Sequence, residues 1–332
     1  MTSRDFRTDE NDAFERPRRH TKPRTKDRPD YSGAETGVVI TVDRGRFRVL
    51  VQDREVSAAK ARQLGRTGVI VGDRVRVVGD TSGEEGTLGR IVQVEDRRTV
   101  LRRTADDDDP YERPIVANAD QLVIVTALAD PPPRTGMIDR ILVAGFDAGL
   151  APLLCLTKAD LASPDVLLAQ YGPLDVAIAV TRPGADLAEL RRRLAGHRSV
   201  FVGHSGVGKS TLVNALIPDA FRATSHVNEV TGRGRHTSSS AIALRLPADP
   251  AIDGDPGWVI DTPGVRSFGL SHVTPQRIVA AFDDLAAIVA DCPRGCTHTA
   301  AEPECALDDA VGRGELSPVR LESFRRMLGS GQ

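Results

Sequence analysis

The segment Gly203-His204-Ser205-Gly206-Val207-Gly208-Lys209-Ser210 decides the fold of this chain. It fits the pattern G-x-x-x-x-G-K-[ST], in which backbone N–H groups surround a phosphate at the start of a helix. Residues 199–202 predict a short buried strand before it, and the apolar spacing of residues 211–216 predicts a helix after it. This strand, loop and helix indicate a nucleoside triphosphate site, rather than a Gly-rich turn with a chance Lys-Ser pair.

The side chains of this loop have different expected roles. Lys209 reaches the β- and γ-phosphates and is a candidate catalytic residue, and the Ser210 hydroxyl binds Mg²⁺. We expect the nucleotide to contact the whole run of residues Gly203, His204, Ser205, Gly206, Val207, Gly208, Lys209, Ser210 and Thr211.

Length and cysteine content limit the class of protein. A chain of 332 residues suits two or three domains, and four cysteines are too few for a disulfide framework, which indicates a reducing compartment. No apolar run approaches the length of a membrane span, and the N-terminus lacks the apolar core of a signal peptide. We expect a cytoplasmic protein that does not contact a membrane and acts as a monomer.

The net charge of −2 hides an asymmetry along the chain. Residues 36–103 carry 14 Lys/Arg against 9 Asp/Glu, and residues 1–35 carry 9 against 8, so the remainder has a net charge of −8. A basic module joined to an acidic one favours contact between the basic part and a polyanion such as RNA. A solvated surface explains the charge alone equally well.

Residues 1–35 predict a disordered basic tail, because they are polar, interrupted by proline and nearly free of aliphatic side chains. Seven Lys/Arg residues between Arg16 and Arg28 either contact RNA phosphates or only keep the tail solvated.

Residues 36–103 show short alternating strands separated by Gly- and Asp-rich turns, at 38–42, 46–51, 74–78 and 88–94. Four or five strands without a long helix predict a small barrel, with an OB-fold preferred and an SH3-like barrel as the alternative. Four arginines alternate with apolar residues and so lie on one strand face, which suits an RNA backbone: Arg46, Arg48, Arg74 and Arg76.

Residues 104–115, with the acidic run Asp106–Asp109, predict a solvated linker. Residues 116–272 then alternate between strands and helices, which predicts a doubly wound α/β domain. We expect its strands at 120–126, 152–156, 176–180 and 200–202, and helices at 137–149 and 186–194.

The tetrapeptide Thr157-Lys158-Ala159-Asp160 stands at the end of one of these strands and fits the guanine-reading motif [NT]-K-x-D. The carboxylate of Asp160 accepts two hydrogen bonds, from N1–H and the 2-amino group of guanine, and the stem of Lys158 lies across the base. Adenine has neither donor at those positions and would leave the carboxylate unpaired. Thr157, Lys158 and Asp160 are therefore candidate GTP-binding residues, and Val180-Thr181-Arg182 is a weaker candidate for a backbone contact to guanine O6.

The segment Asp261-Thr262-Pro263-Gly264 fits D-x-x-G, which places Asp261 near Mg²⁺ and the Gly264 amide at the γ-phosphate. The Gly/Arg-rich residues 231–238 resemble a switch segment in which Thr237, or Ser238, joins Ser210 and Asp261 around Mg²⁺.

Val265 stands where Ras-like proteins carry the Gln that orients the attacking water. A valine cannot orient water, so hydrolysis is expected to be slow until a partner binds. His236 is the candidate catalytic residue for this task, because a neutral imidazole can orient or polarise water. The alternative is that His236 contacts only RNA or solvent.

The order of these motifs is reversed relative to ordinary GTPases, because the guanine reader at 157–160 precedes the phosphate loop at 203–210. This order predicts a circularly permuted GTPase domain, which is possible where the original termini lie close together.

Residues 273–332 predict a helical zinc-binding domain, with helices at 275–290 and 316–328. Three thiols and an imidazole within fourteen positions suit one structural, tetrahedral Zn²⁺, although scattered reduced cysteines are the alternative. The candidate ligands are Cys292, Cys296, His298 and Cys305. Cys155 lies in a predicted core strand and is expected only to pack. The last helix carries arginines that could face an acidic partner, namely Arg320, Arg325 and Arg326.

A basic barrel, a permuted GTPase core with T-K-A-D, G-H-S-G-V-G-K-S, G-R-H-T-S and D-T-P-G-V, and a Cys/His cluster together resemble the ribosome-small-subunit-dependent GTPase A family. The resemblance covers about residues 36–328. Two cysteine-cluster spacings differ by one residue from the family pattern, and this spacing still allows zinc. The resemblance implies a GTPase that acts late in small-subunit maturation, is stimulated by that subunit, and contacts ribosomal RNA through its barrel and zinc domain.

The sequence therefore predicts a zinc-containing, circularly permuted GTPase that needs Mg²⁺ with GTP and has the small ribosomal subunit and its rRNA as partners. An RNA-binding GTP/GDP switch with negligible turnover is the first alternative. A P-loop kinase or ATPase is the second, and Asp160 argues against it.

Overall fold

The computed structural model describes residues 31–65, 67–104, 112–218, 220, 241–263 and 274–330. The chain divides into two units, Met1–Gly33 and Ala34–Gln332, and the architecture below is that of the second unit. Most of the predicted tail lies outside the described residues, as do Asp106–Asp109, the segment 231–238 with His236 and Thr237, and Gly264.

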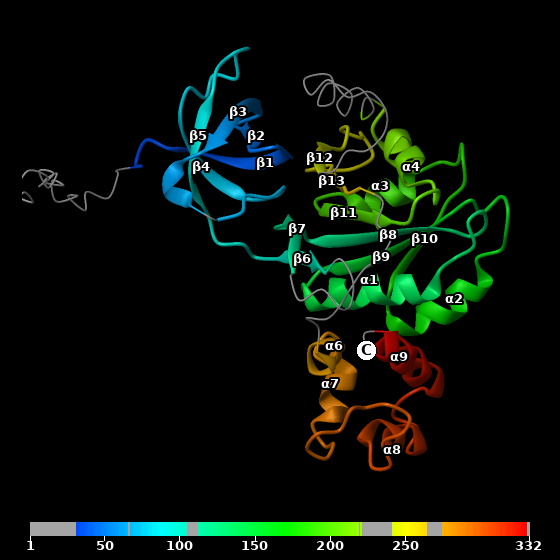
Figure 1. Ribbon diagram of the computed structural model, residues 1–332. Helices are drawn as coiled ribbons and strands as arrows, with labels where there is room; N and C mark the ends of the chain where they lie inside the picture. The colour runs from blue at the N-terminus through cyan, green and yellow to red at the C-terminus, as the bar shows by residue number, and fades with distance from the viewer. Residues whose placement is uncertain are drawn as a thin grey trace, which may run out of the picture. The chain divides into compact units, whose positions relative to one another are not determined.

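The first five strands form a closed barrel (Figure 1). They are β1 (Glu35–Asp43), β2 (Arg46–Val51), β3 (Arg54–Lys60), β4 (Arg74–Gly79) and β5 (Gly89–Val94), with a short 3₁₀ turn, η1 (Arg62–Leu64), after β3. The strand order is β1-β2-β3-β5-β4, and β4 pairs back with β1 to close the ring. All neighbours are antiparallel except β3 and β5. A closed five-stranded barrel with this connectivity confirms the predicted OB-fold.

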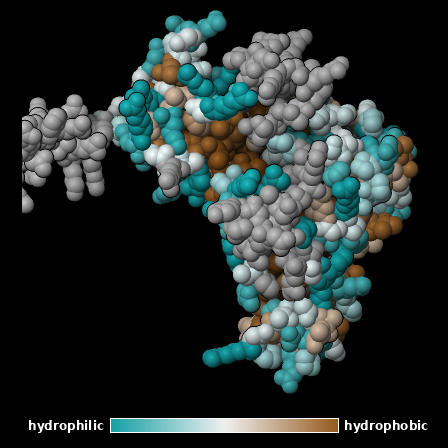
Figure 2. Space-filling model, in the orientation of Figure 1, coloured by the Kyte–Doolittle hydropathy of each residue, from teal (hydrophilic) through white to brown (hydrophobic). Residues whose placement is uncertain are grey.

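Alternating side chains fill the barrel and cover its outside. In β2 the residues alternate between buried and at least partly exposed, so Phe47, Val49 and Val51 point into the core and Arg46 and Arg48 point outward. The barrel surface visible in the space-filling view carries hydrophilic areas next to a hydrophobic patch (Figure 2). The predicted outward face of arginines is therefore present.

A second set of strands forms the parallel sheet of the α/β domain, in the order β10-β9-β8-β11-β13. These strands are β8 (Gln121–Ala127), β9 (Ala151–Thr157), β10 (Ala177–Val180), β11 (Arg198–Gly203) and β13 (Trp258–Asp261). All seven residues of the central strand β8 are buried, as expected for a parallel strand covered on both faces. The antiparallel strand β12 (Ile242–Arg245) pairs with β13.

Helices cover both faces of this sheet (Figure 1). On one face, α1 (Thr135–Asp147) and α2 (Asp165–Tyr171) pack on Leu122 and Ile124, and η2 (Gly172–Leu174) follows α2. On the other face, α3 (Ala188–Leu194) and α4 (Lys209–Leu216) pack on Val123 and Val125. This is the doubly wound arrangement that the alternating sequence predicted.

The barrel and the α/β sheet join edge to edge in this unit. Strand β1 pairs with β12 at Thr41 and Ile242, so that a single hydrogen-bonded sheet runs through both. A short hairpin of β6 (Val100–Arg103) and β7 (Arg113–Ala117) lies between them in sequence. The linker predicted at 104–115 extends too far, because its last three residues belong to β7, which pairs with β6.

The last part of the chain is helical: α6 (Pro275–Val279), α7 (Asp283–Val289), α8 (Ala306–Gly312) and α9 (Pro318–Ser330). The prediction of one helix over 275–290 is wrong, because α6 ends at Val279 and α7 begins at Asp283. Between them the buried Phe282 packs its ring on Phe146 of α1, with centroids 4.6 Å apart. Among the described residues, no helix is both long and apolar enough to cross a membrane.

Candidate nucleotide site and metal centre

The phosphate-binding segment connects β11 to α4, as its sequence predicted. Two of its glycines are required by the backbone. A Cβ on Gly203 would lie 2.5 Å from the carbonyl oxygen of Val125, so the loop begins pressed against β8. Gly208 has a φ of 87°, a left-handed conformation that disfavours other residues, and α4 begins directly after it. The backbone N–H groups at this helix start are the expected phosphate donors.

Lys209 lies buried under this loop, with 7% of its surface exposed. Its ammonium donates a hydrogen bond to the carboxylate of Asp261 and another, at 2.5 Å, to the carbonyl oxygen of Thr262. The Thr262 hydroxyl donates in turn to the Phe201 carbonyl, at 2.7 Å, which ties the D-x-x-G segment to β11. The structure therefore brings together the lysine of the phosphate loop and the predicted Mg²⁺-binding carboxylate.

Thr157 connects the guanine reader with the phosphate loop. Its hydroxyl lies 2.5 Å from the carbonyl oxygen of Val207 and 3.2 Å from that of Thr126, and it donates its one proton between them. The hydroxyl is buried and faces the protein backbone. This geometry gives Thr157 a positioning role, holding the ends of β9 and the phosphate loop side by side.

The rest of the reader follows at the end of β9. Lys158 has a positive φ of 57°, and its ammonium donates to the carbonyl oxygen of Asp130 in the loop after β8. The Ala159 N–H donates to the Thr181 carbonyl at 3.1 Å, and the Thr181 N–H to the Leu156 carbonyl at 2.8 Å. The reader is therefore bonded to Thr181 of the segment 180–182, the weaker candidate for a contact to guanine O6, and the Asp160 side chain is exposed.

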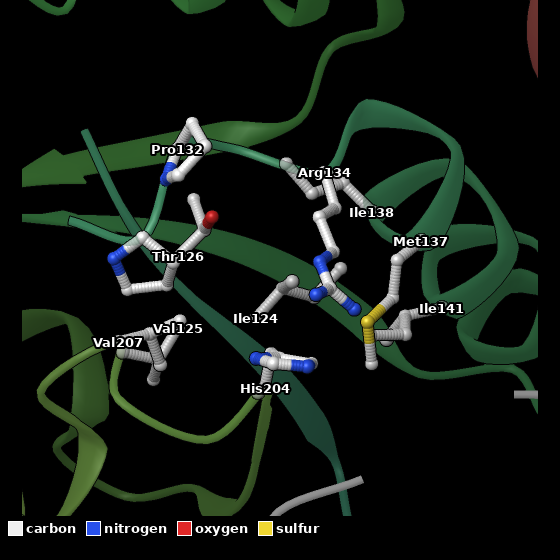
Figure 3. Close-up of a pocket in the computed structure, with 12 residues that line it drawn as sticks. Ile124, Val125, Thr126, Pro132, Arg134, Met137, Ile138, Ile141, His204 and Val207 are labelled. Atoms are coloured by element: carbon white, nitrogen blue, oxygen red, sulfur yellow. The ribbon is translucent and has the colours of Figure 1, made fainter. Parts of the chain in front are cut away.

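A pocket opens beside the first half of the phosphate loop (Figure 3). Apolar side chains from β8 and α1 line it, including Ile124, Met137 and Ile138, together with Gly203 and His204. The guanidinium of Arg134, from the loop between β8 and α1, extends toward the His204 ring. The sequence analysis did not predict this pocket. It lies at the carboxyl end of the parallel strand β8, and ligand sites of α/β sheets form at such ends, so the position of the strand could have indicated it.

The four predicted metal ligands converge in the loop between α7 and α8. The thiols of Cys292, Cys296 and Cys305 and a ring nitrogen of His298 all lie within 4.8 Å of one another. The Cys292 sulfur is 3.6 Å from His298 Nδ1, and the Cys305 sulfur is 3.9 Å from the same nitrogen. Three soft thiolates and one imidazole form a complete tetrahedral donor set for Zn²⁺.

Burial controls the protonation of these ligands. Desolvation raises the pKa of the Cys292 thiol to about 11, raises the pKa of the Cys305 thiol, and lowers the pKa of His298. A bound cation reverses this preference, because a coordinating thiol is deprotonated. Burial also raises the pKa of Cys155, to about 12, in the middle of β9, and this inert thiol only packs in the core.

Several arginines that were predicted to contact RNA or an acidic partner form ion pairs within the chain instead. On the barrel, Arg48 pairs with Glu55 and Arg74 with Glu95. On α9, all three arginines bond within the chain: Arg320 to Asp284, Arg325 to Asp308 and Arg326 to Asp139. The expectation that the α9 arginines face an acidic partner is therefore wrong.

Comparison with known proteins places these features in one family. The family model described as RsgA GTPase matches residues 94–271, which is more than half of the chain. The small ribosomal subunit biogenesis GTPase RsgA of Azotobacter vinelandii is 37% identical over 313 residues, covering 91% of this chain and 87% of the relative. The protein of that name from Pseudomonas aeruginosa is 37% identical over 310 residues, with the same two coverages.

Two solved structures share the fold. The crystal structure of YjeQ from Thermotoga maritima has a TM-score of 0.63 and 26% identity, covering 90% of this chain and 98% of that one. The structure of YloQ, a circularly permuted GTPase, also has a TM-score of 0.63, with 23% identity, and covers 91% of this chain and 96% of that one. At that identity the second match shows the fold alone.

Proposed function

This chain belongs to the RsgA GTPase family, and we propose that it hydrolyses GTP on the small ribosomal subunit, late in the maturation of that subunit. Relatives named small ribosomal subunit biogenesis GTPase match along nine-tenths of the chain. One observation carries the proposal: the Thr157 hydroxyl bonds the guanine reader to the phosphate loop, while Lys209 of that loop contacts Asp261. Three separate sequence motifs thus form one site.

We assign GTP binding to the segment from Gly203 to Thr211, to Lys158 and Asp160 at the base, and to Asp261 and Gly264 at the γ-phosphate. Thr157 supports the site through the backbone of Val207. For Mg²⁺ we propose Ser210, Asp261 and Thr237. The donor set fits the ion, because hydroxyl and carboxylate oxygens suit a hard cation. Lys209, which contacts Asp261 here, would release that carboxylate when it reaches the phosphates. When bound, Mg²⁺ neutralises charge that develops on the phosphates.

We propose that His236 orients the attacking water when the subunit is bound. The support is the sequence: Val265 has no group that can hold water, and His236 is adjacent to Thr237. His236→Ala should leave the affinities for GTP and for the small subunit nearly unchanged and abolish most of the stimulated rate. A stimulated rate that persists in this variant would mean that another group, such as one from the ribosome, places the water.

We propose one structural Zn²⁺ on Cys292, Cys296, His298 and Cys305, and contact between the barrel and ribosomal RNA. The exposed Arg46, Arg62 and Arg90 support the RNA contact, since they form no ion pair with any residue that the structure describes. Arg48 and Arg74 already pair with glutamates and would have to exchange partners. We also propose that the protein is located in the cytosol, in keeping with its proposed action on the small ribosomal subunit, and that it is a monomer.

Phosphate release from GTP, measured with and without purified small subunits, tests the function. We expect slow release alone and a large increase with small subunits, none with large subunits, and none for Lys209→Ala. GTP binding without stimulated release would instead indicate a binding switch with negligible turnover.

A further inference from the structure

Arg326 of α9 and Asp139 of α1 form a partly buried ion pair between the zinc-binding helices and the GTPase domain. The guanidinium meets both carboxylate oxygens, with Nε to Oδ2 at 3.2 Å and Nη2 to Oδ1 at 3.4 Å. Only 2% of the Asp139 side chain is exposed. A buried carboxylate needs its cation, and the planar guanidinium contacts both oxygens in one orientation. The pair therefore constrains how α9 is rotated about its own axis and where it lies along α1.

The same guanidinium also contacts the end of α2. It lies over the Tyr171 ring, 5.1 Å from the ring centroid. The Tyr171 hydroxyl donates to the carbonyl oxygen of Thr135, the first residue of α1, at 3.2 Å. Arg326, Asp139 and Tyr171 thus hold three helices at one point, and we call these three residues the α9 clamp.

The α9 clamp is one residue along α1 from the pocket beside the phosphate loop. Asp139 directly follows Ile138, which lines the pocket beside the phosphate loop together with Met137, Gly203 and His204 (Figure 3). Tyr171 ends the helix that follows the guanine reader at 157–160. A shift of α1 at Asp139 would therefore move one wall of the pocket beside the phosphate loop.

On its other side α9 is bonded to the metal centre. Arg325, the neighbour of Arg326, donates from Nε to the carbonyl oxygen of His298 at 3.0 Å and forms two bonds with Asp308 of α8. Consecutive residues of one helix thus contact a zinc ligand and the GTPase domain. A short path, from His298 through Arg325, Arg326 and Asp139, therefore connects the metal centre with the wall of the pocket.

We propose that Arg326 is a positioning residue for GTP hydrolysis, which through Asp139 holds α1 in place as a wall of the pocket beside the phosphate loop, and so makes the hydrolysis rate depend on the zinc-binding helices. This inference rests on the proposed GTPase activity. The effect falls on the rate rather than on GDP affinity. The rate is the quantity expected to change, because reaction geometry is sensitive to small displacements.

The test is single-turnover GTP hydrolysis by the full chain, with and without small subunits, in Arg326→Gln, Arg326→Lys and Asp139→Asn. We expect Arg326→Gln to reduce the hydrolysis rate constant about tenfold, within the range of coupling through packed networks. The dissociation constant for a fluorescent GDP and the zinc content should stay at wild-type values. Arg326→Lys keeps the charge and should recover part of the rate. Asp139→Asn combined with Arg326→Gln should be no slower than Arg326→Gln alone, because both act through one contact.

The matched control is Arg313→Gln, which removes an exposed pair with Glu315 in the zinc-binding helices and should hydrolyse GTP at the wild-type rate. Equal rates in wild type, Arg326→Gln and Arg313→Gln would overturn the inference and leave the proposed function intact. So would a joint loss of hydrolysis, GDP binding and zinc in Arg326→Gln that Arg326→Lys does not relieve, since that is a folding defect. A wild type that hydrolyses no GTP overturns the proposed function and the inference with it.

Discussion

At the scale of single residues, backbone contacts position the nucleotide motifs. The Thr157 hydroxyl bonds to the Val207 carbonyl, and Gly203 is pressed against Val125. Both contacts join the phosphate loop to a neighbouring strand of the sheet. Side chains that bind the ligand can then project from a backbone whose place is already set.

Gly203→Ala tests this close approach. The added Cβ would meet a backbone oxygen at 2.5 Å, which cannot move without displacing β8. We expect a loss of about 1–3 kcal/mol in the free energy of unfolding, and weaker GDP binding, measured by denaturant titration and fluorescence. Gly136→Ala, in the first turn of α1 with open space around it, is the control and should be neutral or stabilising. Equal behaviour of both variants would contradict the argument.

Asp160→Asn tests the guanine assignment. The variant loses the carboxylate that accepts two hydrogen bonds from guanine, so GTP affinity should fall by a few kcal/mol and xanthine nucleotides, which carry an acceptor at C2, should bind better. Competition between GTP and xanthosine triphosphate measures the change. Asp165→Asn, exposed in the first turn of α2, is a matched control without an expected effect. Unchanged GTP affinity in Asp160→Asn would remove the basis for guanine recognition.

At the scale of elements, the metal loop between α7 and α8 lacks regular secondary structure around its ligands. Its backbone hydrogen bonds are local turns, such as Cys296 N–H to the Pro293 carbonyl at 3.2 Å, and Arg325 bonds to His298. A loop held by turns of this kind gains order from a bound ion. The chemistry of the ligands predicts how that binding depends on pH.

Zinc binding at pH 7 should release about three protons, one from each coordinating thiol. Burial raises the pKa of Cys292 and Cys305, so these thiols are protonated before binding, whereas the lowered pKa of His298 keeps its ring neutral. Zinc affinity should therefore rise with pH through the neutral range. Calorimetry in two buffers of different ionisation enthalpy counts the protons. Cys155→Ala should not alter the count, and a release of one proton or none would exclude thiolate coordination.

At the scale of the whole unit Ala34–Gln332, one hydrophobic core joins the zinc-binding helices to the GTPase domain. Phe324 and Met327 of α9 belong to the same buried cluster as Ile141 and Leu142 of α1. Figure 1 shows α9 below α1, and the two helices are in contact. The C-terminal helices are therefore part of the domain's stability rather than an independent attachment.

Phe324→Ala should destabilise the α/β sheet as well as α9. Removing a fully buried phenylalanine costs about 3–5 kcal/mol, and the single tryptophan of the chain, Trp258 on β13, reports unfolding of the sheet. We expect the denaturant midpoint followed by Trp258 fluorescence to fall. Val319→Ala, on the same helix but 52% exposed, should change it little. A tryptophan transition that Phe324→Ala leaves in place would show that the helices unfold separately.

The sequence by itself determined the features that depend on local patterns. The phosphate loop, the guanine reader and the D-x-x-G segment each have a defined spacing, and their order alone implied the permutation. Continuous apolar runs identified β8 and β9, because a strand covered on both faces needs apolar residues at every position. The Cys/His cluster was equally local, since its four ligands lie within fourteen positions of each other.

Only the tertiary structure decided the features that depend on distant partners. Strand β3 buries just Val56 and Ala58 and was not recognised, because its pairing with β2 and β5 supplies what its own sequence lacks. The helix expected at 275–290 divides where Phe282 turns inward to meet Phe146, 136 positions earlier in the chain. The charge of the α9 arginines was visible in the sequence, but their partners were not. Whether an arginine faces solvent or a buried carboxylate is set by which elements pack together, and Asp139 lies 187 positions from Arg326.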